Sequence, residues 1–104
     1  MANYLLVYHG GGAPSDPAEG EKVMKAWMDW FGGLGAAVVD GGNPAGAAKV
    51  VASNGSVSDG GPSGITGYSV LAADNLDAAA KMAKGCPILA SGGSVEVVET
   101  FNAM

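Results

Sequence analysis

Residues 16–35 read DPAEGEKVMKAWMDWFGGLG, and this stretch carries the strongest structural signal in the chain. Asp16 is a helix-capping residue, Pro17 suits the first helical position, and Glu19 follows the cap by three residues. Apolar side chains then recur at helical spacing, and the glycine that ends the stretch is a suitable C-terminal stop. The apolar stripe consists of Val23, Trp27, Trp30, Phe31 and Leu34. The pattern predicts a helix over residues 17–34 with one face packed against another element.

The segments around this helix carry strand signals and one further helix signal. Runs rich in β-branched, aliphatic and aromatic residues predict strands, and Asn54-Gly55 between two short runs predicts a hairpin. Asp74 is expected to cap a second helix, which Gly85 and Pro87 stop. Strands are expected over residues 4–8, 36–40, 65–71 and 94–100, and the hairpin over 49–52 and 56–58.

This order of elements is typical of an α+β fold built from two strand–helix–strand halves. We therefore predict a ferredoxin-like sandwich in which both helices cover one face of the sheet and the hairpin is an insertion. The chain has 104 residues, and we expect residues 1–104 to form a single domain.

Apolar residues stand next to one another in the predicted strands, so both faces of the sheet should carry them. Examples are residues 5–7, 38–39, 70–71 and 97–98. A sheet with one wet face alternates apolar and polar residues, and two helices cover only one face. Burying an exposed Val or Leu contributes about 1.5–3 kcal/mol, so we expect a homodimer whose sheets pack face to face. The alternative is that the inserted hairpin or a loop folds over the free face.

Composition excludes several classes of partner. Charged residues are only 14% of the chain, the net charge is −5, and the five basic residues are all lysine. An acidic chain without arginine is a poor match for nucleic acid or an anionic membrane. Cys86 is the one cysteine, which fits a reducing cytoplasm. We expect no signal peptide, because residues 1–5 lack a basic segment. No ligand spacing or phosphate loop is present, so we expect no metal and no cofactor.

Taken together, several short segments make nearly the whole chain resemble the YCII-related family, including its DGPF-type members. These segments are residues 4–8, 26–27, 30–31, 34–35, 39–42, 59–62, 67–70, 76–79, 83–87 and 92–97. The resemblance implies a dimeric α+β barrel and an activity that is largely unassigned, with a His and an Asp suspected of acid–base chemistry in some members. The chain differs from those members because its first helix contains no histidine.

Three residues are candidates for acid–base chemistry. His9, the one histidine, follows the first strand, and its ordinary pKa suits proton transfer near neutral pH. Asp40 ends the second strand and orients His9 if the two strand ends are adjacent. Asp59 opens the segment Asp-Gly-Gly-Pro and can present a carboxylate to a pocket. The alternatives are a solvent-facing histidine at a strand end and a turn formed by Asp, Gly and Pro.

Three aromatic residues are candidates for a ligand pocket between the helices and the sheet. Trp27 and Trp30 lie on the apolar stripe, and Tyr68 in the third long strand offers a polar handle. The alternatives are a packed core stripe and a cross-strand packing residue.

Three functions follow from these candidates. The first is a small cofactor-free enzyme that binds a small, mostly apolar organic molecule and transfers a proton or hydrolyses it. The second is a non-catalytic ligand-binding or regulatory dimer that uses the same pocket without turnover. The third is an interaction protein without a small-molecule site.

Overall fold

The computed structural model describes residues 2–11, 16–60 and 64–102, and it confirms an α+β fold with two α-helices and antiparallel sheets. In chain order the elements are β1 (Ala2–His9), α1 (Pro17–Leu34), the 3-10 helix η1 (Gly35–Ala37), β2 (Val38–Asp40), β3 (Lys49–Val51), β4 (Val57–Asp59), β5 (Ile65–Ala73), α2 (Leu76–Ala83), the 3-10 helix η2 (Pro87–Ser91) and β6 (Ser94–Glu99).

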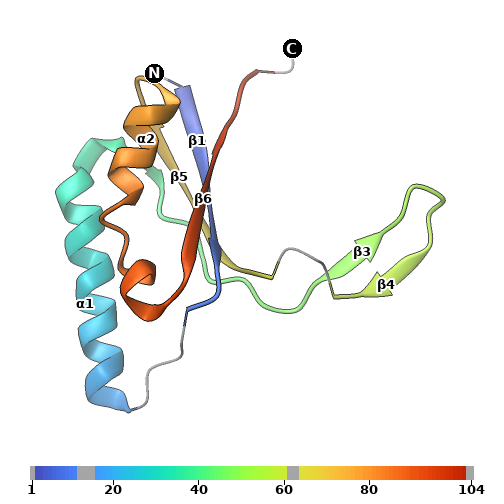
Figure 1. The fold of residues 1–104 in the computed structure, drawn as a ribbon, viewed down its shortest axis with the longest axis horizontal. Coiled ribbons are helices and arrows are strands. Elements are labelled where there is room, and N and C mark those ends of the chain that lie inside the picture. The colour runs from blue at the N-terminus through green and yellow to red at the C-terminus, as the bar shows by residue number, and fades with distance from the viewer. Residues whose placement is uncertain (1, 12–15, 61–63, 103–104) are drawn as a thin grey trace.

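Four strands form the main sheet in the order β2-β5-β1-β6, and every neighbouring pair is antiparallel. Both helices lie on the same side of this sheet (Figure 1). The strands β3 and β4 form a separate two-stranded sheet, as the hairpin signal predicted. Its loop is closed by hydrogen bonds from Gly55 N to Ala52 O and from Ala52 N to Ser56 O.

The signals that place α1 are confirmed. The Asp16 carboxylate accepts a hydrogen bond from the Glu19 amide at 2.8 Å, and Pro17 is the first helical residue. Gly35 follows the helix with a positive φ of 57°, and its amide donates to Phe31 O. The cap and the stop therefore lie where the sequence predicted them.

Several boundary predictions were wrong. The strand β1 begins two residues earlier than predicted, and β5 ends two residues later. Asn75, not Asp74, caps α2, because its side chain accepts from the Ala78 amide at 2.8 Å. The second strand begins at Val38 rather than residue 36, since Gly35–Ala37 continues from α1 as a 3-10 turn. The 3-10 helix η2, which gave no periodic signal, was not predicted.

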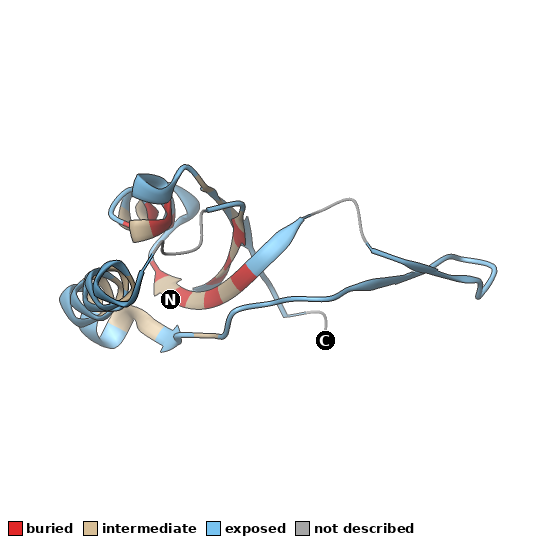
Figure 2. Ribbon diagram, turned by 90° about the horizontal axis from the view of Figure 1, so that it is seen from below, coloured by how far each residue is buried: buried red, intermediate tan, exposed pale blue. Residues whose placement is uncertain are grey.

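Strict alternation along β1 and β5 decides which side chains face the helices. Tyr4, Leu6 and Tyr8 are buried, whereas the residues between them are partly exposed. On β5 the buried side is Gly67, Ser69, Leu71 and Ala73. Figure 2 shows the buried residues on the central strands and on the inner side of α2, where Ala79 and Ala83 permit close approach to the sheet.

The other side of the sheet, which we call the open face, carries apolar side chains that no helix covers. It includes Leu5, Val7, Tyr68, Val70 and Val98. Val98 and Val39 are among the exposed large hydrophobic residues. Within the described residues, the apolar character of both sheet faces is therefore a property of the folded chain.

The inserted hairpin does not fold back over the open face. Residues 48–60, which we call the arm, are all exposed and project from the body on the side away from the helices (Figures 1 and 2). The radius of gyration is 15.2 Å, whereas a compact domain of this length has about 13 Å. The arm therefore leaves the open face uncovered. No helix of the described residues combines the length and apolar character needed to cross a membrane.

Candidate functional site

A cavity of 290 Å³ lies between α1 and the helix-facing side of the sheet. Three aromatic rings, one aliphatic side chain and a glycine-rich segment surround it. Its lining residues are Tyr8, Trp27, Phe31, Gly41, Gly42, Asn43, Pro44, Thr66, Gly67 and Ile88. Small-molecule sites are mostly apolar and aromatic with a few polar groups, and this cavity has that composition at the small end of their size range.

The aromatic wall is a connected set of rings. The ring of Trp27 lies 5.1 Å from that of Tyr8 and 5.8 Å from that of Trp30, both nearly perpendicular. Phe31 is tilted against Trp27 at 5.9 Å and against Trp30 at 5.0 Å. Edge-to-face and tilted pairs at these separations are favourable, so α1 holds the wall in a defined arrangement.

A chain of hydroxyl groups lies beside the cavity. The Tyr8 hydroxyl donates to Ser69 Oγ at 2.7 Å, and Ser69 Oγ donates to Gly41 O at 2.7 Å. Ser69 is fully buried and Tyr8 is 5% exposed. This relay connects β1 and β5 to the segment after β2, and it satisfies polar groups that burial would otherwise destabilise.

Burial changes the acidity of the groups around this relay. It raises the pKa of Tyr8 to about 12, a change that the hydrogen bond with Ser69 reduces and the nearby Cys86 thiol increases. Burial also raises the pKa of the Cys86 thiol. Both groups are therefore protonated at neutral pH, and they offer hydrogen-bonding groups rather than a base or a nucleophile.

Glycines on one side of the cavity allow two backbone segments to approach each other closely. Gly42 has a φ of +74°, and a Cβ at this position would lie 1.7 Å from Tyr68 O. At Gly67 a Cβ would approach a ring carbon of Tyr8 at 3.3 Å. The chain after β2 can therefore approach β5 closely only because side chains are absent there.

The predicted ligand residues separate into three places. Trp27 lines the cavity, as the sequence suggested. Trp30 lies next to it, and its indole nitrogen donates to Met82 O at 3.2 Å, which links α1 to α2. Tyr68 points to the open face, because alternation along β5 puts it opposite to Gly67 and Ser69.

The phenol in the cavity is Tyr8 instead, a residue that sequence reasoning did not select. Its signal was the spacing of Tyr4, Leu6 and Tyr8, which places all three side chains on one side of β1. Which of the two sides faces the helices is not decided by spacing alone.

The three predicted acid–base residues are not brought together. His9 Nε2 lies 3.2 Å from Glu96 Oε1, across β1 and β6. Asp40 accepts a hydrogen bond from the Gly42 amide at 2.8 Å, within its own turn. Asp59 lies on the arm and pairs with Lys49. None of the three lines the cavity.

Strand register explains why Asp40 does not orient His9. Asp40 pairs with Val70, which also pairs with Leu5 of β1. Asp40 is thus level with Leu5, four residues before His9, or about 13 Å along the strand, and β5 lies between them. The ends of the two strands are not adjacent, because β2 stops early and its continuation runs on as a loop.

Two wider grooves flank α1 on its outer side. One of 1020 Å³ is apolar, and all its described lining residues belong to α1, including Met24 and Met28. The other, of 760 Å³, lies between α1 and η2 and has charged residues at its rim, among them Lys22 and Lys84. A single helix does not enclose a ligand, so the cavity beside Tyr8 is the better candidate.

Among the described residues, no group of three His, Cys, Asp or Glu side chains is placed to hold a metal ion. The segment Asp59-Gly60-Gly61-Pro62 is described only at its first two residues, so its role as a site loop lies outside the described residues. Comparison of the chain with family models, with curated proteins and with solved structures finds no match in any of the three.

Proposed function

We propose that this chain is a cytoplasmic, YCII-like homodimer that binds a small, ring-containing organic molecule in the cavity beside Tyr8, without turnover there. One observation carries the proposal: a cavity of 290 Å³ is walled by Tyr8, Trp27 and Phe31 and bordered by a buried hydroxyl relay. Aromatic rings favour a flat apolar ligand, and the few polar groups at the rim orient it. A buried unpaired Cys86 thiol suits a reducing compartment.

The strand order supports the fold implied by this proposal. The strand order β2-β5-β1-β6, the two helices on one face, and the β3–β4 pair between β2 and β5 in the chain are what we expect of a ferredoxin-like sandwich with an inserted hairpin. In a dimeric α+β barrel, two such sheets pack through their uncovered faces. The apolar open face is available for this packing.

Binding is favoured over catalysis because, among the described residues that line the cavity, none offers an available base. His9, Asp40 and Asp59 lie elsewhere, and the Tyr8 and Cys86 groups hold their protons at neutral pH. General acid–base chemistry needs a group that exchanges a proton near the working pH and reaches the substrate.

The two tryptophans allow a direct test, because only Trp27 lines the cavity. In the variant Trp30→Phe, the fluorescence of Trp27 should change when small aromatic compounds such as phenol or benzoate bind. In the matched variant Trp27→Phe, the emission of Trp30 should stay constant at the same concentrations. A parallel thermal-shift screen detects the binding independently, since a ligand at 100 times its Kd stabilises the fold by about 2.7 kcal/mol.

Responses in the two variants decide the outcome. Trp27 also lines the groove of 1020 Å³, together with Met24 and Met28. Saturable changes restricted to Trp27 that persist in a Met24→Lys, Met28→Lys background therefore support binding in the cavity. Changes lost in that background place the compounds in this groove, and changes in Trp30 emission place them in the groove between α1 and η2. No response from a broad screen of ring compounds counts against the proposal.

A second candidate function is acid–base chemistry at His9 and Glu96 on the open face. It is favoured by the 3.2 Å contact between the imidazole and the carboxylate, the arrangement of an oriented general base. Small activated esters, such as nitrophenyl acetate, should then be hydrolysed by the protein and at least tenfold more slowly by His9→Gln. Equal rates in the two proteins would remove this candidate.

A further inference from the structure

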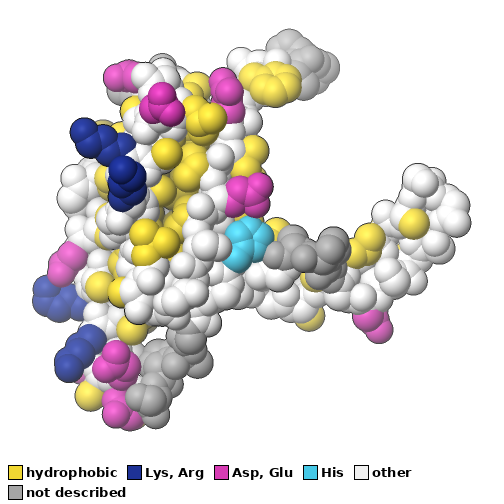
Figure 3. Space-filling view, viewed as in Figure 1, with side chains coloured by type: hydrophobic (Ala, Val, Ile, Leu, Met, Phe, Trp, Pro, Cys, Tyr) yellow, Lys and Arg dark blue, Asp and Glu magenta, His cyan; other side chains and the backbone are white. Residues whose placement is uncertain are grey.

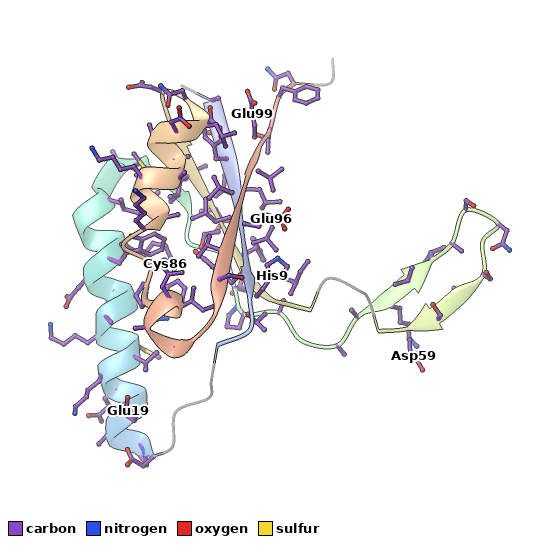
Figure 4. All side chains as sticks on the ribbon, viewed as in Figure 1. His9, Glu19, Asp59, Cys86, Glu96 and Glu99 are labelled. Carbon is purple, nitrogen blue, oxygen red and sulfur yellow. The ribbon has the colours of Figure 1, made fainter. Side chains whose placement is uncertain are left out.

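The arm and the open face together form a corner. The arm leaves the body beside the end of the sheet where His9 and Glu96 lie, and it projects on the side of the sheet away from the helices (Figures 1 and 4). In the space-filling view, the histidine and its acidic neighbour lie where the arm meets the body (Figure 3). Any second molecule that covers the open face must therefore also contact the arm.

The arm lacks support from its own chain. Val51 and Val57 are paired across the hairpin, so both side chains lie on one face of it, and they are 68% and 59% exposed. A single two-stranded hairpin is marginally stable in water unless a further strand or surface packs against it. Within the described residues, β3 and β4 pair only with each other, so each has an outer edge that no further strand covers. The arm thus has the character of a docking element.

Charge on this side of the molecule suits a second copy of the same chain. The net charge is −5, so two copies repel unless the surfaces that meet are neutral. On the arm, Lys49 is paired with Asp59, so their charges offset each other. At the corner, Glu96 contacts His9, which offsets the carboxylate charge only when the imidazole is protonated. The remaining contact surface of the open face is apolar or uncharged on β1 and β5.

The area that a stable dimer interface must bury gives an independent reason for the arm to be part of that interface. Four strands spaced by about 4.8 Å and about six residues long present a face of roughly 400 Å². A stable interface needs about 800 Å² from each partner, so the open face alone is too small. The arm adds roughly 200 Å² to the contact surface of each copy. In a two-fold arrangement, each copy also contributes the area that its partner's arm covers, which is again roughly 200 Å². The sum then reaches the required size.

We infer that the arm of each copy extends along the body of a second copy, so that two arms clasp a face-to-face dimer. This rests on the proposed homodimer and adds that the arm, with Val51 and Val57, is an essential part of its interface. A two-fold axis makes the contacts reciprocal, so each arm contacts the copy that contributes the other arm.

Sedimentation equilibrium of the full chain tests this inference. The double variant Val51→Lys, Val57→Lys should raise the dimer Kd at least tenfold. A matched double variant on the outer side of α1, Met24→Lys and Met28→Lys, changes residues of similar exposure and should leave the Kd within about twofold. Circular dichroism of both variants checks that the body stays folded.

Hydrogen exchange of the unsubstituted protein gives a second measurement. Amides of β3 and β4 should exchange at least tenfold more slowly above the dimer Kd than below it, whereas amides exposed on α1 should not respond to concentration.

Each result has one consequence. A dimer that keeps its Kd in the arm variant, with arm amides unprotected at high concentration, overturns the clasp and leaves the homodimer intact. A chain that is monomeric at 100 μM overturns the homodimer and the clasp together.

Discussion

The hydroxyl of Tyr8 donates a hydrogen bond to the hydroxyl of Ser69 across 2.7 Å, although 61 residues separate them in the chain. The Ser69 hydroxyl donates in turn to Gly41 O. This buried relay ties the first strand, the third long strand of the sequence and the segment after β2 together at the wall of the cavity. The site therefore depends on contacts among three distant parts of the chain.

Removing the first or the middle hydroxyl of the relay should have unequal effects on stability. Ser69→Ala leaves the Tyr8 hydroxyl and Gly41 O without this partner and should lower the free energy of unfolding by about 1–3 kcal/mol. Tyr8→Phe leaves Ser69 still bonded to Gly41 O and should cost about 0.5–1.5 kcal/mol. Urea unfolding of both variants measures the difference. If Tyr8→Phe lowers the free energy of unfolding more than Ser69→Ala does, then Tyr8 does not donate to Ser69 with Ser69 donating in turn to Gly41 O.

Stability should fall in alkaline solution because Tyr8 is harder to ionise when folded. Its pKa is about 12 in the fold and 10.0 ordinarily, so between these values the unfolded chain releases the proton first. The unfolded state then binds fewer protons, and the free energy of unfolding decreases with rising pH, by on the order of 1–2 kcal/mol. Almost no contribution from Tyr8 is expected below about pH 9.

The measurement compares urea unfolding at pH 9.5 and 11.5 in a Cys86→Ala background, since the buried thiol also has a raised pKa. Adding Tyr8→Phe to that background should remove most of the decrease. A decrease of the same size in both proteins would assign it to other groups.

Gly42 should tolerate no side chain. A Cβ there would overlap Tyr68 O at 1.7 Å, and the φ of +74° is itself unfavourable for other residues. Gly42→Ala should lower the free energy of unfolding by more than about 3 kcal/mol, a large effect in a small domain.

Gly92→Ala is the matched control, because Gly92 has a positive φ in the left-handed helical region and nothing within 4 Å of an added Cβ. It should cost only about 1–2 kcal/mol, from backbone strain alone. Similar losses in the two variants would mean that the close approach of Gly42 to β5 is not needed for folding.

A charge at the centre of the open face should prevent self-association. Val70 lies on β5 and pairs with Leu5 on β1, so Val70→Lys places an ammonium group between the two sheets of the proposed dimer. Desolvating an unpaired charge is costly, and the dimer Kd should rise at least a hundredfold. Sedimentation equilibrium compares this variant with Val70→Thr, which keeps the shape and should have a smaller effect. An unchanged Kd for Val70→Lys would place the interface elsewhere.

Local sequence signals predicted the elements well where a side chain acts on its own backbone neighbours. The Asp16 cap, the Pro17 start and the Gly35 stop define α1, because capping and positive-φ residues act within a few residues. The Asn54-Gly55 pair likewise predicted the turn between β3 and β4. Asp74 and its neighbour Asn75 are both residue types that cap helices, and only the backbone conformation makes Asn75 the cap of α2.

The sequence by itself determined the α+β class, the main helices and strands, and the apolar character of both sheet faces, since these follow from local propensity and from periods of two and 3.6 residues. Only the tertiary structure decided the site. The strand register places Asp40 level with Leu5 and not with His9. It also brings Glu96 within 3.2 Å of His9. Tyr8, and not Tyr68, lies on the side of the sheet that faces Trp27. A side chain's neighbours across a sheet come from distant segments, and a single sequence does not specify which segments those are.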